Sequence, residues 1–164
     1  MTEALAADPS AADAPAGAEA VVVRLGAGRF AAELSAVAEV GRVPTLTRIP
    51  GAPEWLRGVA NWRGRLLPVL DLRPLLGAQA SPPGPSARLV VLALDGVSAG
   101  VVVDAVEGTG GLDGTVEEFP AALADRGSLL LAGQVPSEDG PVAVLDIRAV
   151  LRLREELPRA RRSG

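Results

Sequence analysis

The feature that most constrains what this chain can fold into is a series of short apolar runs rich in valine and leucine. The clearest runs are VVVRL at 21–25, RLLPVLDL at 65–72, RLVVLAL at 88–94 and VAVLDI at 142–147. Glycine, proline, asparagine and aspartate interrupt them, and these residues are typical of the turns of β-hairpins. Short strands at regular spacing favour barrels over an open sheet. The pattern therefore predicts a mainly β protein.

The 164 residues fit one ordinary domain or two very small ones. Residues 1–19 are rich in alanine and proline and lack a periodic apolar pattern, which is typical of a disordered tail. We expect one folded domain over 20–156, followed by a basic flexible tail over 157–164. A link of sequence AQASPPGPS separates two halves, about 20–77 and 87–150, and the chain then ends in an amphipathic helix.

One pattern occurs twice in the sequence. LPVLDLRPLL at 67–76 and VAVLDIRAVL at 142–151 both read as an apolar strand, an aspartate and a helical turn. This repeat predicts two similar small β units packed together. Asp71 and Asp146 are predicted to cap the helical turns by accepting backbone N–H bonds. Catalytic or magnesium-binding carboxylates are the alternative for both of them and for Asp104, which also ends an apolar run.

The sequence contains no histidine, cysteine or tyrosine. The commonest general base, the thiol nucleophile and the usual zinc ligands are therefore missing. We predict a protein without catalytic residues, metal or cofactor, and thus not an enzyme.

A glycine motif offers one alternative to this prediction. Gly26, Gly28 and Ala31 match the G-x-G-x-x-A fingerprint of dinucleotide-binding folds. The acidic residue that this fingerprint expects about 20 positions later is missing, and strands do not alternate with long helices. A hairpin turn at GAG is the favoured interpretation, and a nucleotide-binding enzyme remains the alternative.

Charge and hydropathy also limit the partners of this chain. The formal net charge is −4, which argues against nucleic acid as the main partner. No apolar run approaches the roughly 18 to 20 residues that span a bilayer, so we expect no direct membrane insertion. The amino terminus also lacks the basic and apolar regions of a signal peptide, which predicts a cytoplasmic protein.

The segment NWRGR at 61–65 places polar residues directly before an apolar run. Its tryptophan, like Trp55, is either a core residue or an interface anchor. Arg63 and Arg65 flank Gly64, which is consistent with a solvated turn. The other interpretation is a fixed guanidinium group that reaches a carboxylate of a partner.

Several segments together resemble the CheW-like domain family. RIPGAPEWLRGVANWRGRLLPVLDLRPLLG contains the proline loop, the Gly-Val-x-Asn-x-Arg-Gly motif and the Pro-Val-x-Asp-Leu strand of that family. RFAAELSAVAEV, AGVVVDAVEG, LLLAGQV and VAVLDI follow the family pattern in the right order, and the resemblance covers about residues 20–153. It implies two SH3-like five-stranded β-barrel subdomains around a shared hydrophobic core, with short helices and a C-terminal helix.

The resemblance also implies a function. Members of this family are adaptors without catalysis that couple the cytoplasmic tips of chemoreceptors (methyl-accepting chemotaxis proteins) to the regulatory domain of the histidine kinase CheA. They assemble into membrane-associated arrays. A coupler for a CheA-like kinase in surface motility or development is the alternative within the same fold.

Site residues follow from the same resemblance. Receptor contacts are expected at Val37, Glu39, Gly58 and Arg63. Kinase contacts are expected at Val40, Val43 and Leu46. One departure from the family pattern is Trp62, which stands where an aliphatic residue is usual.

Overall fold

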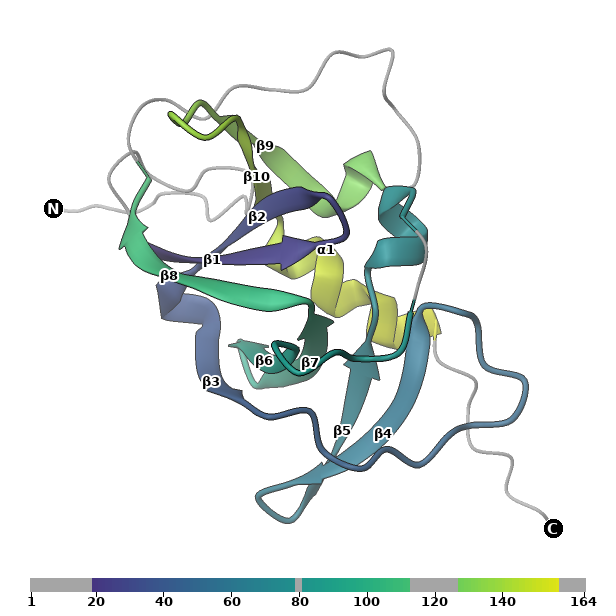
Figure 1. Cartoon of the computed structure of the whole chain (residues 1–164). Coiled ribbons are helices and arrows are strands. Elements are labelled where there is room, and N and C mark those ends of the chain that lie inside the picture. Colours follow the sequence, from purple (N-terminus) through teal and green to yellow (C-terminus); the bar gives the residue numbers. More distant parts are fainter. Residues whose placement is uncertain (1–18, 79–80, 113–126, 157–164) are drawn as a thin grey trace, which may run out of the picture.

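The computed structural model describes residues 19–78, 81–112 and 127–156. Its architecture consists of two five-stranded sheets and a short C-terminal helix (Figure 1). The prediction of a mainly β protein with two five-stranded units and a C-terminal helix is confirmed. The basic tail and the predicted N-terminal tail, apart from Glu19, lie outside the described residues.

Each sheet has its own strand order. Sheet A consists, in spatial order, of β8 (Ala105–Gly111), β1 (Glu19–Leu25), β2 (Gly28–Glu33), β10 (Val142–Leu145) and β9 (Leu131–Val135). Sheet B consists of β3 (Val37–Gly41), β6 (Arg88–Leu94), β7 (Val97–Val103), β5 (Arg65–Leu70) and β4 (Leu56–Trp62). Most neighbours are antiparallel, but β10 runs parallel to β2 and β5 runs parallel to β7.

The two sheets do not follow the sequence halves 20–77 and 87–150. Sheet A takes β1 and β2 from the first half and β8, β9 and β10 from the second, whereas sheet B is built from the middle of the chain. The link after Gly77 joins β5 to β6, and both of these strands belong to sheet B. In the N-terminal hairpin, β2 pairs with β1 along one of its edges. β10 pairs with the other edge of β2, at Phe30 and Ala31. The pairing of β10, near the C-terminus, with β2, near the N-terminus, therefore determines which strands belong to sheet A.

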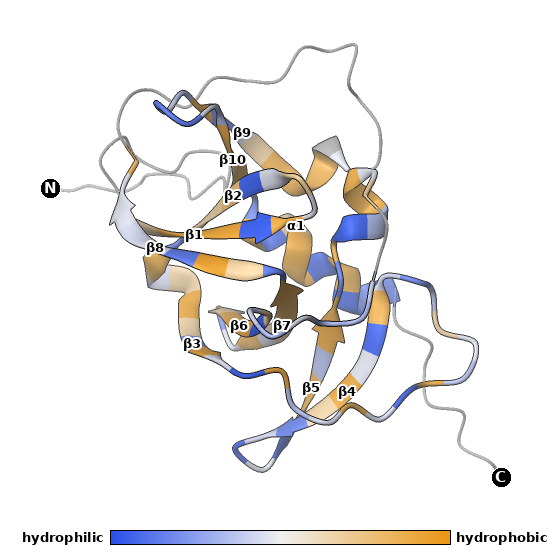
Figure 2. Ribbon diagram, in the orientation of Figure 1, coloured by the Kyte–Doolittle hydropathy of each residue, from blue (hydrophilic) through white to orange (hydrophobic). Residues whose placement is uncertain are grey.

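The core explains why the strands carry apolar residues on both faces. Along β1, Val21 and Val23 belong to the main hydrophobic cluster, while Ala20 belongs to a second cluster on the other face. The main cluster also contains Leu70 of β5 and Val101 of β7, so both sheets contribute to it. A third cluster lies on the other face of sheet B. Figure 2 shows this distribution as hydrophobic strands and a hydrophilic β4–β5 turn.

The turns agree with the hairpins that the sequence predicts. β1 and β2 pair in register from Ala20 opposite Glu33 to Leu25 opposite Gly28. The GAG segment is thus a hairpin turn followed by a strand, and the helix N-terminus that a dinucleotide fingerprint requires is not formed there. The fingerprint interpretation is wrong for this chain.

The C-terminal helix closes the main core. α1 (Ile147–Arg152) continues as the 3-10 turn η6 (Leu153–Glu156). Ile147, Val150 and Leu151 are buried and pack in the main cluster. Within the described residues, no helix is long and apolar enough to cross a membrane.

Candidate interaction site at the β4–β5 hairpin

The β4–β5 hairpin ends in a two-residue turn that projects from sheet B (Figure 1). Trp62 pairs with Arg65, and Arg63 and Gly64 form the turn with φ values of 52° and 78°. Both values are positive, as a type I′ hairpin turn requires. The Asn61 side chain accepts a hydrogen bond from the Gly64 N–H at 3.0 Å, which fixes the turn locally.

Glu39 of β3 lies within hydrogen-bond distance of this turn. Its Oε1 atom accepts one bond from the indole N–H of Trp62 at 3.1 Å and one from Arg63 Nη2 at 2.9 Å. The Arg63 guanidinium carbon also lies 5.1 Å from the centroid of the Trp62 ring, in cation–π range. We call these three residues the Trp62 cluster.

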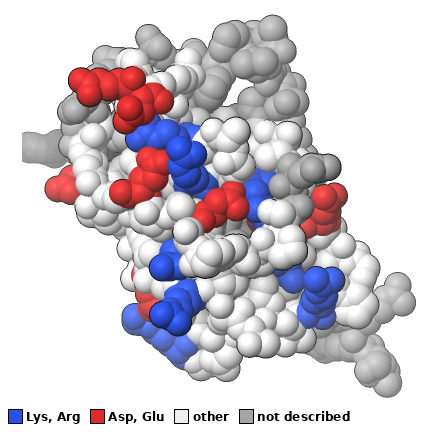
Figure 3. Space-filling model, viewed as in Figure 1, with Lys and Arg blue, Asp and Glu red and all other residues white. Residues whose placement is uncertain are grey.

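The Trp62 cluster is accessible to a partner. The side chain of Arg63 is 68% exposed and that of Glu39 is 40% exposed. The hydrogen bond from Trp62, followed by that from Arg63, lowers the pKa of Glu39 below its ordinary value. Glu39 is thus held as a carboxylate, and the site is a charge pair with a tryptophan beside it. Figure 3 shows arginine side chains at the lower end of the view, where Figure 1 places this hairpin.

The structure brings only some of the predicted receptor-contact residues together. Glu39 and Arg63 form an ion pair. Val37 starts the same strand as Glu39, but it packs against the main core. Gly58 lies within β4 and is buried, so its backbone does not form part of the exposed cluster.

Gly58 has a packing role. It sits at an irregularity between β4 and β5, with a φ value of 145° that L side chains rarely adopt. A Cβ atom at this position would collide with the carbonyl oxygen of Thr47. Thr47 is held there by two backbone hydrogen bonds with Val59, each 2.9 Å long. The glycine allows the loop before β4 to lie against the strand.

The predicted kinase-contact residues follow β3 and the loop after it. Val40 is 41% exposed on β3, which is an end strand of sheet B. Val43 and Leu46 are partly buried against the third cluster. Val40 is therefore the exposed side chain of this set, whereas Val43 and Leu46 support the loop.

The two tryptophans have different environments. Trp55 is 6% exposed and belongs to the main core, which agrees with the core interpretation. Trp62 packs on the third cluster with one face and donates its N–H at the surface, so it combines both roles that the sequence left open. The contact with Glu39 spans 23 positions of sequence and two strands that are not neighbours in sheet B, so no local pattern predicts it.

The aspartates that end apolar runs are not equivalent. Asp146 is the N-cap of α1, and its carboxylate accepts a bond from the Ala149 N–H at 3.1 Å. Leu72, and not Asp71, holds the N-cap position of the 3-10 turn η3 (Arg73–Leu76). Asp71 accepts the Arg73 N–H at 3.0 Å, but its main partner is the Arg73 guanidinium group.

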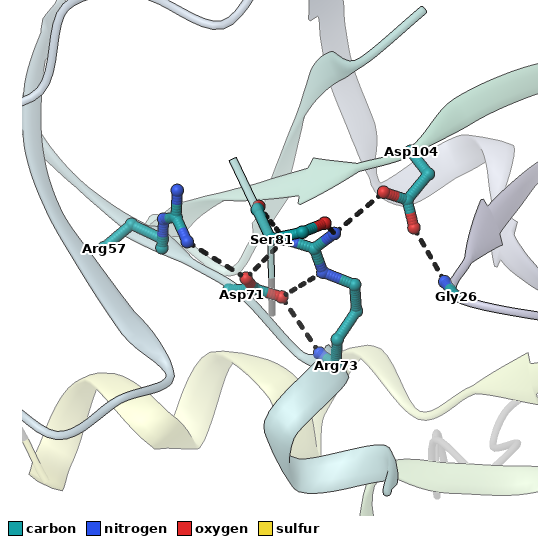
Figure 4. A network of polar contacts seen from close by, with 6 residues as sticks. All are labelled: Gly26, Arg57, Asp71, Arg73, Ser81 and Asp104. Atoms are coloured by element: carbon teal, nitrogen blue, oxygen red, sulfur yellow. Dashed lines mark hydrogen bonds and ion pairs between the residues drawn. The ribbon is translucent and has the colours of Figure 1, made fainter. Parts of the chain in front are cut away.

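Arg73 is the centre of a buried polar network (Figure 4). Its Nε and Nη2 atoms donate to the two oxygens of Asp71 at 2.9 and 2.8 Å, and Nη1 donates to Asp104 at 2.8 Å. Ser81 accepts two more bonds, through its hydroxyl and its carbonyl oxygen. All five N–H groups of the guanidinium are thus used. The hydrogen bond to Asp71, before all other causes, raises the pKa of Arg73 above its ordinary value.

Asp104 has a different role from a helix cap. It follows β7 and precedes β8, so no helical turn begins there. Its second oxygen accepts the Gly26 N–H at 2.7 Å, and its own N–H donates to the Arg24 carbonyl. The network therefore ties sheet B to the β1–β2 hairpin of sheet A. Both of its carboxylates pair with Arg73, and Asp71 also lies 3.6 Å from Arg57 Nη1. Within the described segments, no three acidic, histidine or cysteine side chains form a group that could hold a metal ion.

Comparisons with known proteins show which family the chain belongs to. The model of the CheW-like domain family matches residues 19–155. Protein PilI of Pseudomonas aeruginosa is 44% identical over 85 residues, which are 52% of this chain and 48% of that protein. Chemotaxis protein CheW of Rhizobium meliloti is 33% identical over 90 residues, which are 55% of this chain and 58% of that protein.

A solved structure extends the similarity to the fold. The scaffolding protein TtCheW from Thermoanaerobacter tengcongensis superposes with a TM-score of 0.71 at 25% identity, over 79% of this chain and 88% of that one. The matched part spans about half the length of the curated relatives. Since the family model matches most of the chain in both sheets, this protein belongs to the CheW-like domain family.

Proposed function

We propose that this chain is a non-catalytic adaptor that couples chemoreceptor cytoplasmic tips to the regulatory domain of the histidine kinase CheA. The observation that carries the proposal is the family match over residues 19–155, together with the fold shared with a scaffolding protein. In this proposal the protein is cytoplasmic and is recruited to membrane-associated receptor arrays. Each sheet then corresponds to one SH3-like barrel of the family.

The Trp62 cluster is the proposed receptor contact. Arg63 and Glu39 combine exposed charge with a fixed geometry, which suits recognition of a polar partner surface. Val37, on the same strand as Glu39, packs against the main core but is only partly buried, and its remaining exposed surface adds an apolar contact. Gly58 contributes indirectly, because it lets the loop at Thr47 pack against the hairpin that carries Arg63.

The proposed kinase contact is the outer side of β3 and the loop that follows it. Strands at the end of a sheet have unpaired backbone groups that can pair with a similar sheet of another protein. Among the described strands, β3 pairs only with β6, and Val40 is exposed on it. The outer side of β4 is less suited to such pairing, because Thr47 already occupies it at Val59. Val43 and Leu46 then support the loop after β3 by packing against the third cluster.

A binding experiment tests both contacts. The whole chain is used as bait for a purified CheA regulatory domain and, separately, for a receptor tip fragment. We expect both to bind, Arg63→Ala to weaken the receptor arm only, and Arg65→Ala, a change in the same hairpin, to leave both arms unchanged. Binding of neither partner by the wild-type chain would overturn the proposal.

A second candidate function is coupling to a CheA-like kinase that controls surface motility or development. The relatives of this chain include proteins that are not named as chemotaxis proteins. One of them, PilI, is 44% identical over its match, whereas the Rhizobium chemotaxis protein CheW is 33% identical. The comparisons therefore support this alternative as much as the chemotaxis function. Regulatory domains of both kinds of kinase from the source organism can be compared in the same binding assay. The tighter partner identifies the pathway.

A further inference from the structure

We propose that Trp62 is a positioning residue that holds the Glu39–Arg63 ion pair closed, so that a partner meets a charge-compensated donor–acceptor pair at this hairpin. This inference rests on the proposed receptor contact and names the chemistry that the contact recognises. It assigns a role to the residue that departs from the family pattern at this position.

The first support is the sharing of one carboxylate oxygen. Trp62 Nε1 and Arg63 Nη2 both donate to Glu39 Oε1, at 3.1 and 2.9 Å. The indole N–H has only one direction in which to donate, because the ring packs on the third cluster. Trp62 therefore orients the carboxylate oxygen to which Arg63 also donates.

The second support is the restraint on Arg63 itself. A solvent-exposed ion pair normally contributes little, because two long side chains must be held in one geometry. Here the two-residue turn fixes the backbone of Arg63 at a φ value of 52°, and the Trp62 ring lies 5.1 Å from its guanidinium carbon. Cation–π attraction holds the guanidinium group beside the ring. The tryptophan thus restricts the Arg63 side chain, so less conformational entropy is lost when the ion pair forms.

The closed pair leaves a defined set of groups for a partner. Among the described residues, nothing donates to Glu39 Oε2, and the Nε and Nη1 groups of Arg63 have no acceptor. A partner side chain that both donates and accepts, such as the carboxamide of Asn or Gln, matches this arrangement. A lone carboxylate matches it less well, because Glu39 already compensates the charge of Arg63 and would repel a second acid.

An aliphatic residue at this position gives a different surface. Without the indole N–H and the ring, Glu39 keeps a single donor and Arg63 loses its stacking partner. The ion pair then opens more often, as exposed pairs do, and Arg63 becomes free to bind a partner carboxylate. Trp62 thereby sets the preference for a neutral polar group over an acidic one.

The first experiment measures the pair in the isolated chain. Side-chain carboxyl resonances of Glu39 are followed by NMR through an acid titration of the wild type, Trp62→Leu, Trp62→Phe and, as a control, Arg65→Ala. We expect the pKa of Glu39 to rise toward its ordinary value in Trp62→Leu, to rise less in Trp62→Phe, which keeps the ring, and to stay unchanged in Arg65→Ala. Equal pKa values in the wild type and in both Trp62 variants would overturn the inference.

The second experiment measures the preference. Two receptor tip fragments are prepared that differ at the residue facing Arg63, one with Gln and one with Glu there. We expect the wild type to favour the Gln fragment, and Trp62→Phe and Trp62→Leu to shift the ratio of the two Kd values toward the Glu fragment by roughly three- to tenfold. An unchanged ratio in both variants would also overturn the inference. If neither fragment binds the wild type, the receptor contact fails, while the titration still decides whether Trp62 holds the pair.

Discussion

At the scale of single residues, the Trp62 cluster shows how a neighbour changes the value of an exposed charge. Arg65 lies in the same hairpin as Arg63, and its side chain is also exposed, but no ion pair involves it in the described part of the chain. The difference lies in the partner, since Glu39 faces Arg63 and is oriented by Trp62. This difference is the reason why the proposed receptor contact is placed at Arg63 and not at Arg65.

The lowered pKa of Glu39 predicts a pH dependence of stability. A carboxyl with a lowered pKa in the folded state contributes stability above its ordinary value of 4.5, and that contribution is lost as the pH falls through the folded pKa. We expect the difference in free energy of unfolding between the wild type and Glu39→Gln to be largest at neutral pH and to vanish in strong acid. Chemical denaturation at a series of pH values measures it.

Glu107 provides the control for this pH dependence. Its pKa is also lowered, first by the hydrogen bond from Arg29, but it lies in sheet A. Glu107→Gln should therefore remove a separate acid dependence and leave the Glu39 difference unchanged. A Glu39→Gln curve parallel to that of the wild type at all pH values would show that the ion pair contributes nothing.

At the scale of the elements, the path of the chain into β4 depends on Gly58. We expect Gly58→Ala to lower the free energy of unfolding by roughly 2–4 kcal/mol, because the new Cβ collides with the Thr47 carbonyl and the backbone conformation is unfavourable. Gly64→Ala is the matched control, since Gly64 also has a positive φ but has open space around it. It should cost only about 1–2 kcal/mol.

The same pair of variants separates folding from contact at Gly58. Loss of receptor binding in Gly58→Ala should follow the loss of folded protein and recover under stabilising conditions. Full stability together with lost binding would mean that Gly58 itself touches the partner.

The start of α1 depends on a single cap. Asp146→Ala removes the acceptor for the Ala149 N–H, and we expect a loss of about 1 kcal/mol in the free energy of unfolding. Asp146→Asn should retain most of the stability, because asparagine is an equally good cap. Thermal denaturation of both variants measures the difference, and equal losses would show that the cap bond does not stabilise α1.

Local sequence patterns were sufficient for most elements and insufficient for their assembly. Apolar runs separated by turn residues such as Asn61 and Gly64 predicted the hairpins, because a hairpin is encoded within a few neighbouring residues. The parallel pairing of β10 with β2 joins residues more than a hundred positions apart, and no local pattern encodes it. Sheet A combines strands from both sequence halves for this reason. For the same reason, the sequence did not predict that Trp62 donates a hydrogen bond to Glu39, which lies 23 positions away.

At the scale of the whole molecule, the buried network around Arg73 joins the two sheets. Asp71 lies at the end of β5, while Asp104 lies at the end of β7 and binds the β1–β2 turn at Gly26. The side chains of Asp71 and Arg73 are 0% and 3% exposed. A buried ion pair of this kind does not by itself stabilise a fold beyond an apolar alternative, but loss of one partner leaves an uncompensated charge. The network therefore makes the contact between the sheets sensitive to single substitutions.

Removing Arg73 tests this dependence. We expect Arg73→Ala to lower the free energy of unfolding by roughly 3–5 kcal/mol, since it leaves Asp71 buried without its main partner. The double variant Asp71→Leu with Arg73→Met should cost less than the single change, because the fully buried carboxylate is removed together with its main partner. Arg57 and Asp104 each lose a partner in this variant, but their side chains are 22% and 35% exposed and can be hydrated. Arg148→Ala, which removes an exposed pair with Asp95, should cost less than about 1 kcal/mol. Hydrogen exchange should also show lost protection at Gly26 in Arg73→Ala, because Asp104 is no longer held toward that N–H. A double variant as unstable as Arg73→Ala would mean that shape, and not charge, holds the two sheets together at this point.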